Sequence, residues 1–468
     1  MSSIAIIGAG ITGLCAAYEL SRRGVPVRVF ESGGEPGGVI RSTRRDGFLA
    51  ECGPNTLLDT SPKIPELIRQ LGLSAEMLYS HPEANNKYVI RGGKPIALSS
   101  SIPGFLATPL FSWGAKLRLM REPFIARSSP NQEESLAAFV QRRLGNEFLD
   151  YAINPFVAGV YAGDPWKLSV REAFAKVYDL EQKYGSLIKG QFLGAKERKK
   201  RGTVSKQNAA KISFKEGLQT LPKALAATLG TNIEYQQRLT LLERTTHGWR
   251  LQFNGERSEE FDAVLTTIPA YRLAEINVRG MDPSSFAFLK KIPYAPVSSV
   301  VLGFRREQIA HPLNGFGFLV PEVEKMTILG SIFNSSLFPY RAPEGHVTLT
   351  SYLGGLRSPE LPFESPDRQI KRTLDDLNKV LGIRGEPVFT QQVTYPKAIP
   401  QYEIGYSSIR AAIEQLESKN SGLYLGGNYR GGVSLSDSIV NGLDFGARIE
   451  SIFPSRSHSH SENFSAVN

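Results

Sequence analysis

The stretch Ile4-Ala5-Ile6-Ile7-Gly8-Ala9-Gly10-Ile11-Thr12-Gly13 decides the fold of this 468-residue chain. Its continuous apolar start is typical of a buried parallel strand, and its glycines follow the pattern Gly-x-Gly-x-x-Gly. The first glycine permits a tight turn, Gly10 lets the backbone approach a pyrophosphate, and Gly13 permits close packing of a helix on the strand. The sequence therefore predicts a dinucleotide-binding turn at a helix N-terminus.

The residues that follow complete a strand–helix–strand unit. Apolar residues recur at helical spacing over Leu14–Leu20, and Gly24 is placed to end the helix. Val25–Phe30 predicts a second strand ending at Glu31, which lies 21 residues after Gly10. An acid at this place can hold ribose hydroxyls. The glycines alone are a weak signal, but strand, helix and acid in register indicate dinucleotide binding.

Two further glycine-rich elements favour FAD over NAD. Gly37-Gly38-Val39-Ile40-Arg41 follows closely on Glu31 and again lets the backbone come near a phosphate. Near the other end of the chain, Gly426-Gly427-Asn428-Tyr429-Arg430-Gly431-Gly432-Val433 precedes a helix predicted over Ser436–Ile452. That helix N-terminus can face the electron-rich edge of a flavin ring. The alternative interpretation is that Gly426–Gly432 is only a loop.

Composition excludes several classes of protein. Hydrophobic residues make up 41% and charged residues 21%, which excludes global disorder and collagen-like repeats, and the length suggests two or three domains. The two cysteines, Cys15 and Cys52, cannot form a disulfide framework, which suits a reducing compartment. None of the six histidines lies in a metal motif, so no metal is expected. The net charge of +10 favours acidic partners.

The middle of the chain is predicted to be helical. Amphipathic segments such as Val170–Leu180 predict helices up to about Ser186, and Lys196–Arg201 is interpreted as a solvated basic loop. Short β-rich runs follow, among them Val347–Tyr352. The Ser- and His-rich tail Ser455–Asn468 is expected to be disordered.

No signal, transit or membrane-spanning segment is predicted. The chain enters its first strand directly after Ser3, and no apolar run reaches the ~18 residues of a spanning helix. The run Ile102–Trp113, with Lys116, Arg118 and Arg121 nearby, is expected to lie on an anionic membrane surface; burial in a core is the alternative. These features predict a cytoplasmic protein peripherally associated with the inner face of the cell membrane.

Several stretches resemble the FAD-dependent protoporphyrinogen oxidases, within the wider monoamine-oxidase-like flavoprotein group. The resemblance runs from Ile4 to about Ile449. The opening through Gly38 is shared by the wider group. The stretches typical of the porphyrinogen branch are Gly53-Pro54-Asn55-Thr56, Gln182-Lys183-Tyr184-Gly185-Ser186-Leu187-Ile188, Phe214-Lys215-Glu216-Gly217-Leu218-Gln219-Thr220-Leu221-Pro222, Ser335-Ser336-Leu337-Phe338-Pro339 and Ala398-Ile399-Pro400-Gln401-Tyr402.

The resemblance implies an α/β fold with a Rossmann-like FAD-binding domain, a mixed-sheet substrate domain and an inserted helical membrane-associated domain. The implied boundaries are 1–75 with 211–280 and 415–455 for FAD, 76–98 with 281–414 for substrate, 99–210 for the helical domain and 456–468 for the tail. FAD is expected to be bound non-covalently. The implied FAD contacts are Gly8, Ala9, Gly10, Ile11, Thr12, Gly13, Glu31, Ser32, Gly38, Val39, Arg41, Gly53, Pro54, Asn55, Thr56, Leu239 at the adenine end, Val433, Ser434 and Leu435.

Substrate residues are also implied by the resemblance. Lys87 stands where many members carry an arginine that anchors a propionate; lysine keeps the charge but loses the bidentate fork. Asn55 is the candidate polar group beside the reacting edge, with a turn residue as the equal alternative. Tyr406 stands where many members have histidine, which removes any role for a histidine there. Candidates for an apolar slot, with core packing as the alternative for each, are Leu313, Phe318, Leu329 and Phe338.

The implied reaction removes six electrons from protoporphyrinogen IX in three two-electron steps through FAD, with dioxygen as acceptor and hydrogen peroxide as product. A coproporphyrinogen III oxidase, an amine or carotenoid oxidoreductase, and a flavin-binding membrane scaffold without turnover are the alternatives. Ferrochelatase and a second copy of the chain are candidate partners. Nucleic acid is not expected, because the basic stretch lacks interleaved aromatic residues.

Overall fold

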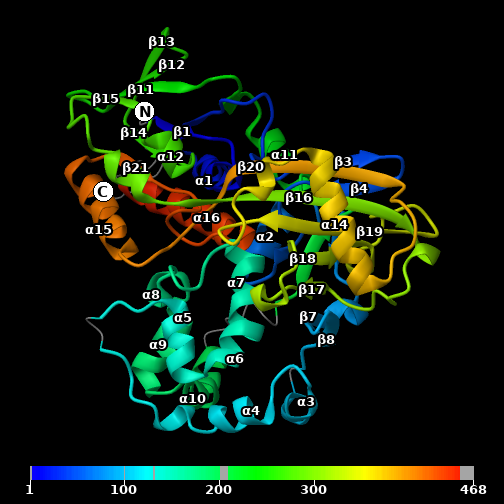
Figure 1. The fold of residues 1–468 in the computed structure, drawn as a ribbon. Coiled ribbons are helices and arrows are strands. Elements are labelled where there is room, and N and C mark those ends of the chain that lie inside the picture. The colour runs from blue at the N-terminus through cyan, green and yellow to red at the C-terminus, as the bar shows by residue number, and fades with distance from the viewer. Residues whose placement is uncertain (1–2, 100, 130–131, 201–208, 454–468) are drawn as a thin grey trace, which may run out of the picture.

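The strand–helix–strand unit forms the centre of a parallel sheet in the computed structural model, which describes residues 3–99, 101–129, 132–200 and 209–453 (Figure 1). All four residues of β1 are buried, as expected for a strand covered on both faces. The second strand begins at Val27, not Val25, because Pro26 has no N–H for the ladder. The parallel strands are, in spatial order, β10 (Ile233–Glu234), β2 (Val27–Phe30), β1 (Ile4–Ile7), β14 (Ala263–Thr266) and β21 (Leu423–Leu425).

Two long helices pack against each other beside this sheet, α1 (Ile11–Arg22) and α16 (Leu435–Ile452). A Cβ on Gly442 would lie 2.4 Å from the carbonyl oxygen of Thr12, and one on Gly446 would lie 2.7 Å from Cβ of Glu19. From Gly442 to Gly446 the contact on α1 moves from Thr12 to Glu19, so the chain advances in the same direction in both helices and they run parallel. Counted back from these two contacts, α16 begins three to six residues, or roughly 5–9 Å, on the N-terminal side of the start of α1.

Smaller elements surround this part. Helices α2 (Lys63–Gln70) and α11 (Thr220–Leu229) contribute to its core. One sheet consists of β13 (Arg257–Phe261), β12 (Trp249–Phe253), β11 (Leu239–Arg244) and β15 (Asn277–Arg279). Two more consist of β3 (Ser42–Arg45) with β4 (Phe48–Glu51), and of β5 (Leu57–Leu58), β9 (Lys211–Phe214) and β6 (Met77–Tyr79).

A seven-stranded mixed sheet forms a second part of the molecule. Its order is β20 (Phe389–Pro400), β16 (Tyr294–Arg305), β19 (His346–Gly354), β18 (Ile328–Phe333), β17 (Gly317–Leu319), β7 (Lys87–Arg91) and β8 (Lys94–Ala97). Helix α14 (Pro366–Leu381) covers one face through Leu377 and Leu381. The opposite face meets helix α7 (Asn154–Tyr161), where Ala158 contacts Leu329 in one apolar cluster. The mixed α/β fold is thus confirmed.

Helices fill the region between 102 and 200. They are α3 (Ile102–Ala107), α4 (Trp113–Leu119), α5 (Leu136–Arg143), α6 (Asn146–Phe148), α7, α8 (Val170–Ala173), α9 (Ala175–Tyr184) and α10 (Leu187–Lys200). The helix predicted over Val170–Leu180 is broken at Phe174, whose φ is −131° and ψ 42°. The loop predicted at Lys196–Arg201 is wrong as far as Lys200, because this run of good helix formers continues α10. Arg201 and the tail 456–468 lie outside the described residues.

A fully buried ion cluster holds these helices together. The Arg143 guanidinium lies 2.6 Å from a carboxylate oxygen of Glu122 and 2.5 Å from one of Glu181. Glu122 also accepts a 2.5 Å hydrogen bond from the Ser186 hydroxyl and one from the backbone N–H of Leu187. Burial raises the pKa of Glu122, but these hydrogen bonds outweigh it and hold the pKa below its ordinary value. The stretch Gln182–Ile188 therefore has a structural role, because its residues Ser186 and Leu187 bind the buried Glu122.

Candidate functional site

The glycine turn forms a hollow lined by backbone at the start of α1. A Cβ on Gly10 would meet nothing within 4 Å, and one on Gly38 would lie 3.6 Å from Cα of Gly10. The N–H of Gly37 donates to the carbonyl of Ala9 at 2.8 Å, which fixes the second glycine pair beside the first. No side chain caps the N-terminus of α1. Free N–H groups at a helix start beside open backbone fit a pyrophosphate.

Gly13 has the packing role that the sequence predicted. A Cβ there would lie 2.1 Å from the carbonyl oxygen of Gly8 and 2.7 Å from the hydroxyl of Thr267. Gly8 itself has a φ of +103°, a conformation that favours glycine. Both residues are thus required by the turn itself, whereas Gly10 leaves space for a ligand.

Glu31 lies beside this turn at the carboxyl end of β2. One carboxylate oxygen accepts the N–H of Ala9 at 2.8 Å, and the other accepts the N–H of Gly33 at 2.7 Å and the hydroxyl of Ser32 at 3.3 Å. The carboxylate is therefore fixed next to the pyrophosphate hollow. Leu239, predicted at the adenine end, packs its side chain in the core with Phe30, so it can offer a ligand only its backbone.

The stretch Gly53–Thr56 packs against the second glycine pair. A Cβ on Gly53 would lie 2.1 Å from the carbonyl oxygen of Val39, so only glycine fits there. The side chain of Val39 is 55% exposed and that of Arg41 is exposed as well. The guanidinium group of Arg41 forms an ion pair with Glu35, at 3.5 Å.

Asn55 is buried in a hydrogen-bond network that joins two parts of the molecule. Its amide nitrogen donates to the carbonyl of Gly53 at 3.3 Å and to the phenol oxygen of Tyr352. Its amide oxygen accepts from Asn334 at 2.5 Å. Burial raises the pKa of Tyr352, so the phenol stays protonated at neutral pH. Asn55 is thus more than a turn residue.

Sequence reasoning missed Tyr352 and Asn334. Asn334 directly precedes the stretch Ser335–Pro339, and Tyr352 ends a run already predicted to be a strand. The one signal available was chemical, because a buried tyrosine hydroxyl or asparagine amide needs a polar partner. Nothing in the sequence said that the partner would be Asn55.

The C-terminal glycine loop leads into the N-terminus of α16. Ser434 caps this helix by accepting the N–H of Asp437 at 3.2 Å, so the loop predicted at Gly426–Val433 does precede a helix start, at Leu435. The phenol of Tyr402 accepts the N–H of Gly432 at 3.0 Å. Val433 packs against both the core that contains Phe30 and Leu239 and the core of the helical part.

The four apolar candidates do not come together. Leu329 lies with Tyr352 on the sheet face that meets α7, whereas Leu313 and Phe318 pack in the core on the face covered by α14. Phe338 belongs to a separate small cluster. Of these four, the structure brings only Leu329 to the face where Asn55 bonds Tyr352. Core packing, the alternative interpretation, describes Leu313, Phe318 and Phe338.

Lys87 begins β7, where it pairs with Gly317 of β17, and burial lowers the pKa of its ammonium group. Tyr406, which stands in place of a histidine, is buried and donates to the carbonyl of Tyr429 in the C-terminal loop. This hydrogen bond therefore anchors the glycine loop that precedes α16. Within the described residues, no three His, Cys, Asp or Glu side chains gather where a metal ion could bind.

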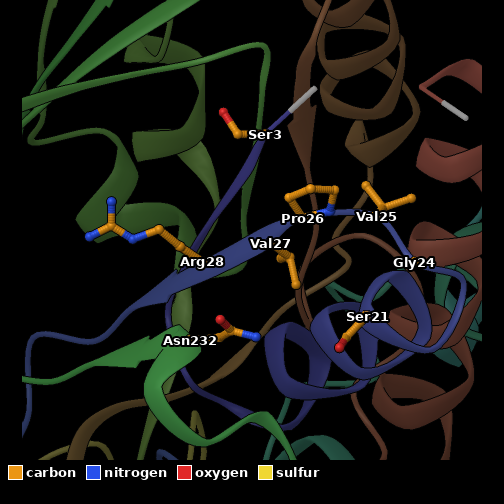
Figure 2. A pocket seen from close by; sticks show the side chains of 8 residues that line it. All are labelled: Ser3, Ser21, Gly24, Val25, Pro26, Val27, Arg28 and Asn232. Carbon is orange, nitrogen blue, oxygen red and sulfur yellow. The ribbon is translucent and has the colours of Figure 1, made fainter. Parts of the chain in front are cut away.

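A hollow at the opposite end of the parallel sheet is a different feature. Figure 2 shows it lined by Ser3, Pro26, Arg28 and Asn232, at the amino ends of β1 and β2. Dinucleotides bind outside the carboxyl ends of such strands. The hollow therefore does not belong to the candidate cofactor site.

The residues present fit an extended dinucleotide. The start of α1 faces the pyrophosphate hollow, and the start of α16 lies roughly 5–9 Å farther out in the direction in which α1 points its N-terminus. Asn55 and Val433 lie toward this farther end, since Asn55 bonds to the mixed sheet and Val433 precedes α16. Two helix starts spaced in this way can face the pyrophosphate and the flavin ring of one extended cofactor.

Comparison with known proteins agrees with this geometry. Protoporphyrinogen oxidase 2 from Arabidopsis thaliana is 33% identical over 467 residues, which cover 94% of this chain and 92% of that protein. Coproporphyrinogen III oxidase from Staphylococcus aureus is 31% identical over 462 residues, covering 94% and 97%. A protoporphyrinogen-oxidase-like crystal structure from Exiguobacterium sp. 255-15 has the same fold, with a TM-score of 0.80, 24% identity and coverage of 96% and 99%.

The family model described as flavin containing amine oxidoreductase matches residues 11–444, nearly the whole chain. The cofactor expected from the glycine turns is therefore FAD, and the chain is an oxidoreductase that belongs to the flavin containing amine oxidoreductase family.

Proposed function

We propose that this flavoprotein oxidises protoporphyrinogen IX to protoporphyrin IX in tetrapyrrole biosynthesis, with dioxygen as acceptor and hydrogen peroxide as product. The observation that carries the proposal is similarity over 94% of the chain to relatives named for porphyrinogen oxidation, at 33% and 31% identity. FAD, when bound, supplies the two-electron acceptor for each of three steps.

The residues of the mixed sheet suit a flat, poorly soluble macrocycle. Leu329 and Tyr352 lie on one face of the sheet, in an apolar cluster that includes Ala158 of α7. Asn55 is fixed on Tyr352 and Asn334 and places a polar group at this face. Because forming the aromatic porphyrin drives the reaction, these residues need to bind and orient the substrate more than to move its protons.

Coproporphyrinogen III is the second candidate substrate. It carries four carboxylates, and the net charge of +10 favours it, as does the Bacillus subtilis coproporphyrinogen III oxidase at 29% identity. An aerobic assay should offer both porphyrinogens side by side, with porphyrin fluorescence as readout and an enzyme-free control. We expect the higher kcat/KM for protoporphyrinogen IX. A preference for coproporphyrinogen III would reverse the assignment, and no turnover by FAD-loaded protein would refute both.

We also propose peripheral binding to an anionic membrane, at the inner face of the cell membrane. Exposed apolar side chains gather on α3, α4, α10 and the turn Glu122–Phe124, which share one end of the molecule, away from the sheets (Figure 1). They are Ile102, Leu106, Trp113, Leu117, Met120, Phe124, Phe192 and Leu193. In the described part of the chain, no helix is both long and apolar enough to span a bilayer.

One cation expected at this surface is not there. Lys116 is buried, because its ammonium group donates to the carbonyls of Leu106 and Thr108 at 2.8 Å. Arg118 and Arg121 remain exposed. The surface is therefore mainly apolar, with Phe124 88% and Trp113 66% exposed, and insertion of aromatic side chains should dominate its membrane affinity.

Sedimentation with vesicles containing anionic lipid tests this proposal. Phe124→Ser with Trp113→Ser should release most of the protein into the supernatant while FAD content stays unchanged. The matched control is Phe363→Ser, an exposed phenylalanine on the sheet part. Equal sedimentation of both variants, or none for the wild type, would contradict membrane binding through this surface.

A further inference from the structure

Two buried tyrosines hold the glycine loop that precedes α16. The Tyr402 phenol donates to the carbonyl of Asn428 at 2.5 Å and accepts the N–H of Gly432 at 3.0 Å, so it joins both ends of the segment Asn428–Gly432. The Tyr406 phenol donates to the carbonyl of Tyr429 inside this segment. The segment Asn428–Gly432 is called the clamped loop below.

The clamped loop depends on contacts from outside it. Gly432 has a φ of +115°, and a Cβ there would lie 2.5 Å from the carboxylate of Asp437, so only glycine fits. Glycine loses more backbone entropy on ordering than any other residue. Bonds to fixed side chains offset that entropy and hold such a loop in one conformation. Burial raises the pKa of Tyr402 and of Tyr406, so both phenols stay protonated and can donate to the loop.

Tyr402 is itself fixed by the mixed sheet and by the helical region. It lies just beyond the end of β20 at Pro400, and its carbonyl accepts the N–H of Ser169 at 2.9 Å. Its ring centre lies 4.6 Å from that of Tyr406 and 6.2 Å from that of Tyr161 on α7. Residues outside the parallel-sheet part therefore set the position of the clamped loop.

The clamped loop leads into the N-terminus of α16, the end that carries the partial positive charge of the helix. Val433 alone separates Gly432 from the capping residue Ser434. The bond from Gly432 to Tyr402 thus fixes the backbone where the chain enters the helix. A reduced flavin carries more negative charge than an oxidised one, so a helix start facing it favours the reduced form. Because this effect falls off within one turn of helix, it is sensitive to where α16 begins.

We propose that Tyr402 and Tyr406 are positioning residues for the flavin, because they hold the clamped loop and thereby keep the start of α16 where it favours reduced FAD. The inference goes beyond the proposed function, since it concerns the cofactor and holds for any substrate. Both residues act through the loop, and neither needs to touch the cofactor. Removing a phenol hydroxyl should therefore lower the reduction potential of bound FAD while the ring keeps its packing.

The test measures the two-electron reduction potential of bound FAD against a reference dye, with no porphyrinogen present. Tyr402→Phe loses both bonds to the loop. We expect it to weaken binding of reduced FAD about tenfold more than binding of oxidised FAD, which corresponds to a potential about 30 mV lower. Tyr406→Phe loses one bond and should lower the potential by less. Tyr161→Phe is the matched control, because its phenol lies in the same group of rings but donates to the carbonyl of Ala173, at 3.0 Å.

An unchanged potential in Tyr402→Phe would overturn the positioning role, and so would an equal shift in Tyr161→Phe. A visible spectrum of bound FAD that changes in Tyr402→Phe and not in Tyr161→Phe would support it. If Tyr402→Phe does not retain FAD, the potential of Tyr406→Phe decides the question by the same criterion. Failure of the proposed function looks different, because the wild type would then oxidise neither porphyrinogen, while the potentials of the FAD-loaded proteins would still test the role of the two tyrosines.

Discussion

Replacing Gly10 by alanine should weaken FAD binding without unfolding the protein, whereas replacing Gly13 should destabilise the fold itself. Gly10 has φ −68° and ψ 168°, which alanine adopts readily, and its new methyl group would meet no protein atom within 4 Å. At Gly13 the methyl group would lie 2.1 Å from the carbonyl oxygen of Gly8. A backbone atom at the centre of the turn cannot move aside alone.

The magnitudes follow from these contacts. For Gly10→Ala the protein loses only a good helix-capping residue, which costs about 1 kcal/mol or less. The methyl group occupies the space of the pyrophosphate, and overpacking of about 1–3 kcal/mol corresponds to a roughly 5- to 150-fold loss of FAD affinity. For Gly13→Ala the same overpacking lowers the unfolding free energy of the apoprotein, because α1 must move away from β1.

Two measurements separate the cases: urea unfolding of the apoprotein, and fluorescence titration of apoprotein with FAD. Gly114→Ala is the control, because a Cβ there meets only the Ser112 hydroxyl, at 3.7 Å, far along the chain from the glycine turn. If Gly10→Ala binds FAD like wild type, the hollow at α1 is not the pyrophosphate site. Equal loss of apoprotein stability in Gly10→Ala and Gly13→Ala would also refute the reasoning.

Three further predictions concern buried polar groups. Arg143→Met should lower the urea-unfolding free energy by about 3–5 kcal/mol, because it leaves the buried carboxylate of Glu122 without its cation and leaves Glu181 with Arg142 alone; a loss below 1 kcal/mol would contradict this. Asn55→Ala should cost about 1–3 kcal/mol by removing one hydrogen bond from Tyr352 and one from the buried Asn334, and should shift the visible spectrum of bound FAD; an unchanged spectrum would place Asn55 away from the flavin. Burial raises the pKa of Glu51 to about 7, above its ordinary 4.5, so its favourable contribution is complete below pH 4.5 and is lost as pH rises through 7. Relative to Glu51→Gln, wild type should therefore lose about 3 kcal/mol of unfolding free energy between pH 4.5 and 8, and parallel pH profiles in urea would disprove it.

The cofactor turn could be predicted from sequence because its determinants are local. Gly10, Gly13 and Glu31 lie within one strand–helix–strand unit, and each follows from backbone sterics that any such unit imposes. The C-terminal loop was predictable for the same reason, since Ser434 caps the helix that follows it. In both places the residues that determine the structure lie close together in the sequence.

The sheet face of Tyr352 and Leu329, which we propose as the substrate face, could not be predicted in the same way, because it depends on register. Tyr352 meets Asn55 across 297 residues of chain, and Asn334 meets it across 279. Whether Phe318 or its neighbour Leu319 faces α7 is decided by strand pairing, and a slip of one residue exchanges the faces. Leu329 lies at an irregularity in the pairing of β18 with β19, which alternation along the sequence does not reveal.

Helix α7 connects the substrate face with the helical end of the molecule. Ala158 packs on Leu329, while Val157 of the same helix lies in the core of the helical part, which Val433 before α16 also contacts. The substrate face, the flavin-side loop and the helical part therefore meet around one helix. A change at the exposed apolar end should reach the substrate face only through this core. Membrane binding and substrate binding should consequently be separable: Phe124→Ser should lose vesicle binding and keep KM for a detergent-dispersed porphyrinogen, whereas a KM that rises in parallel would show that the two surfaces are coupled.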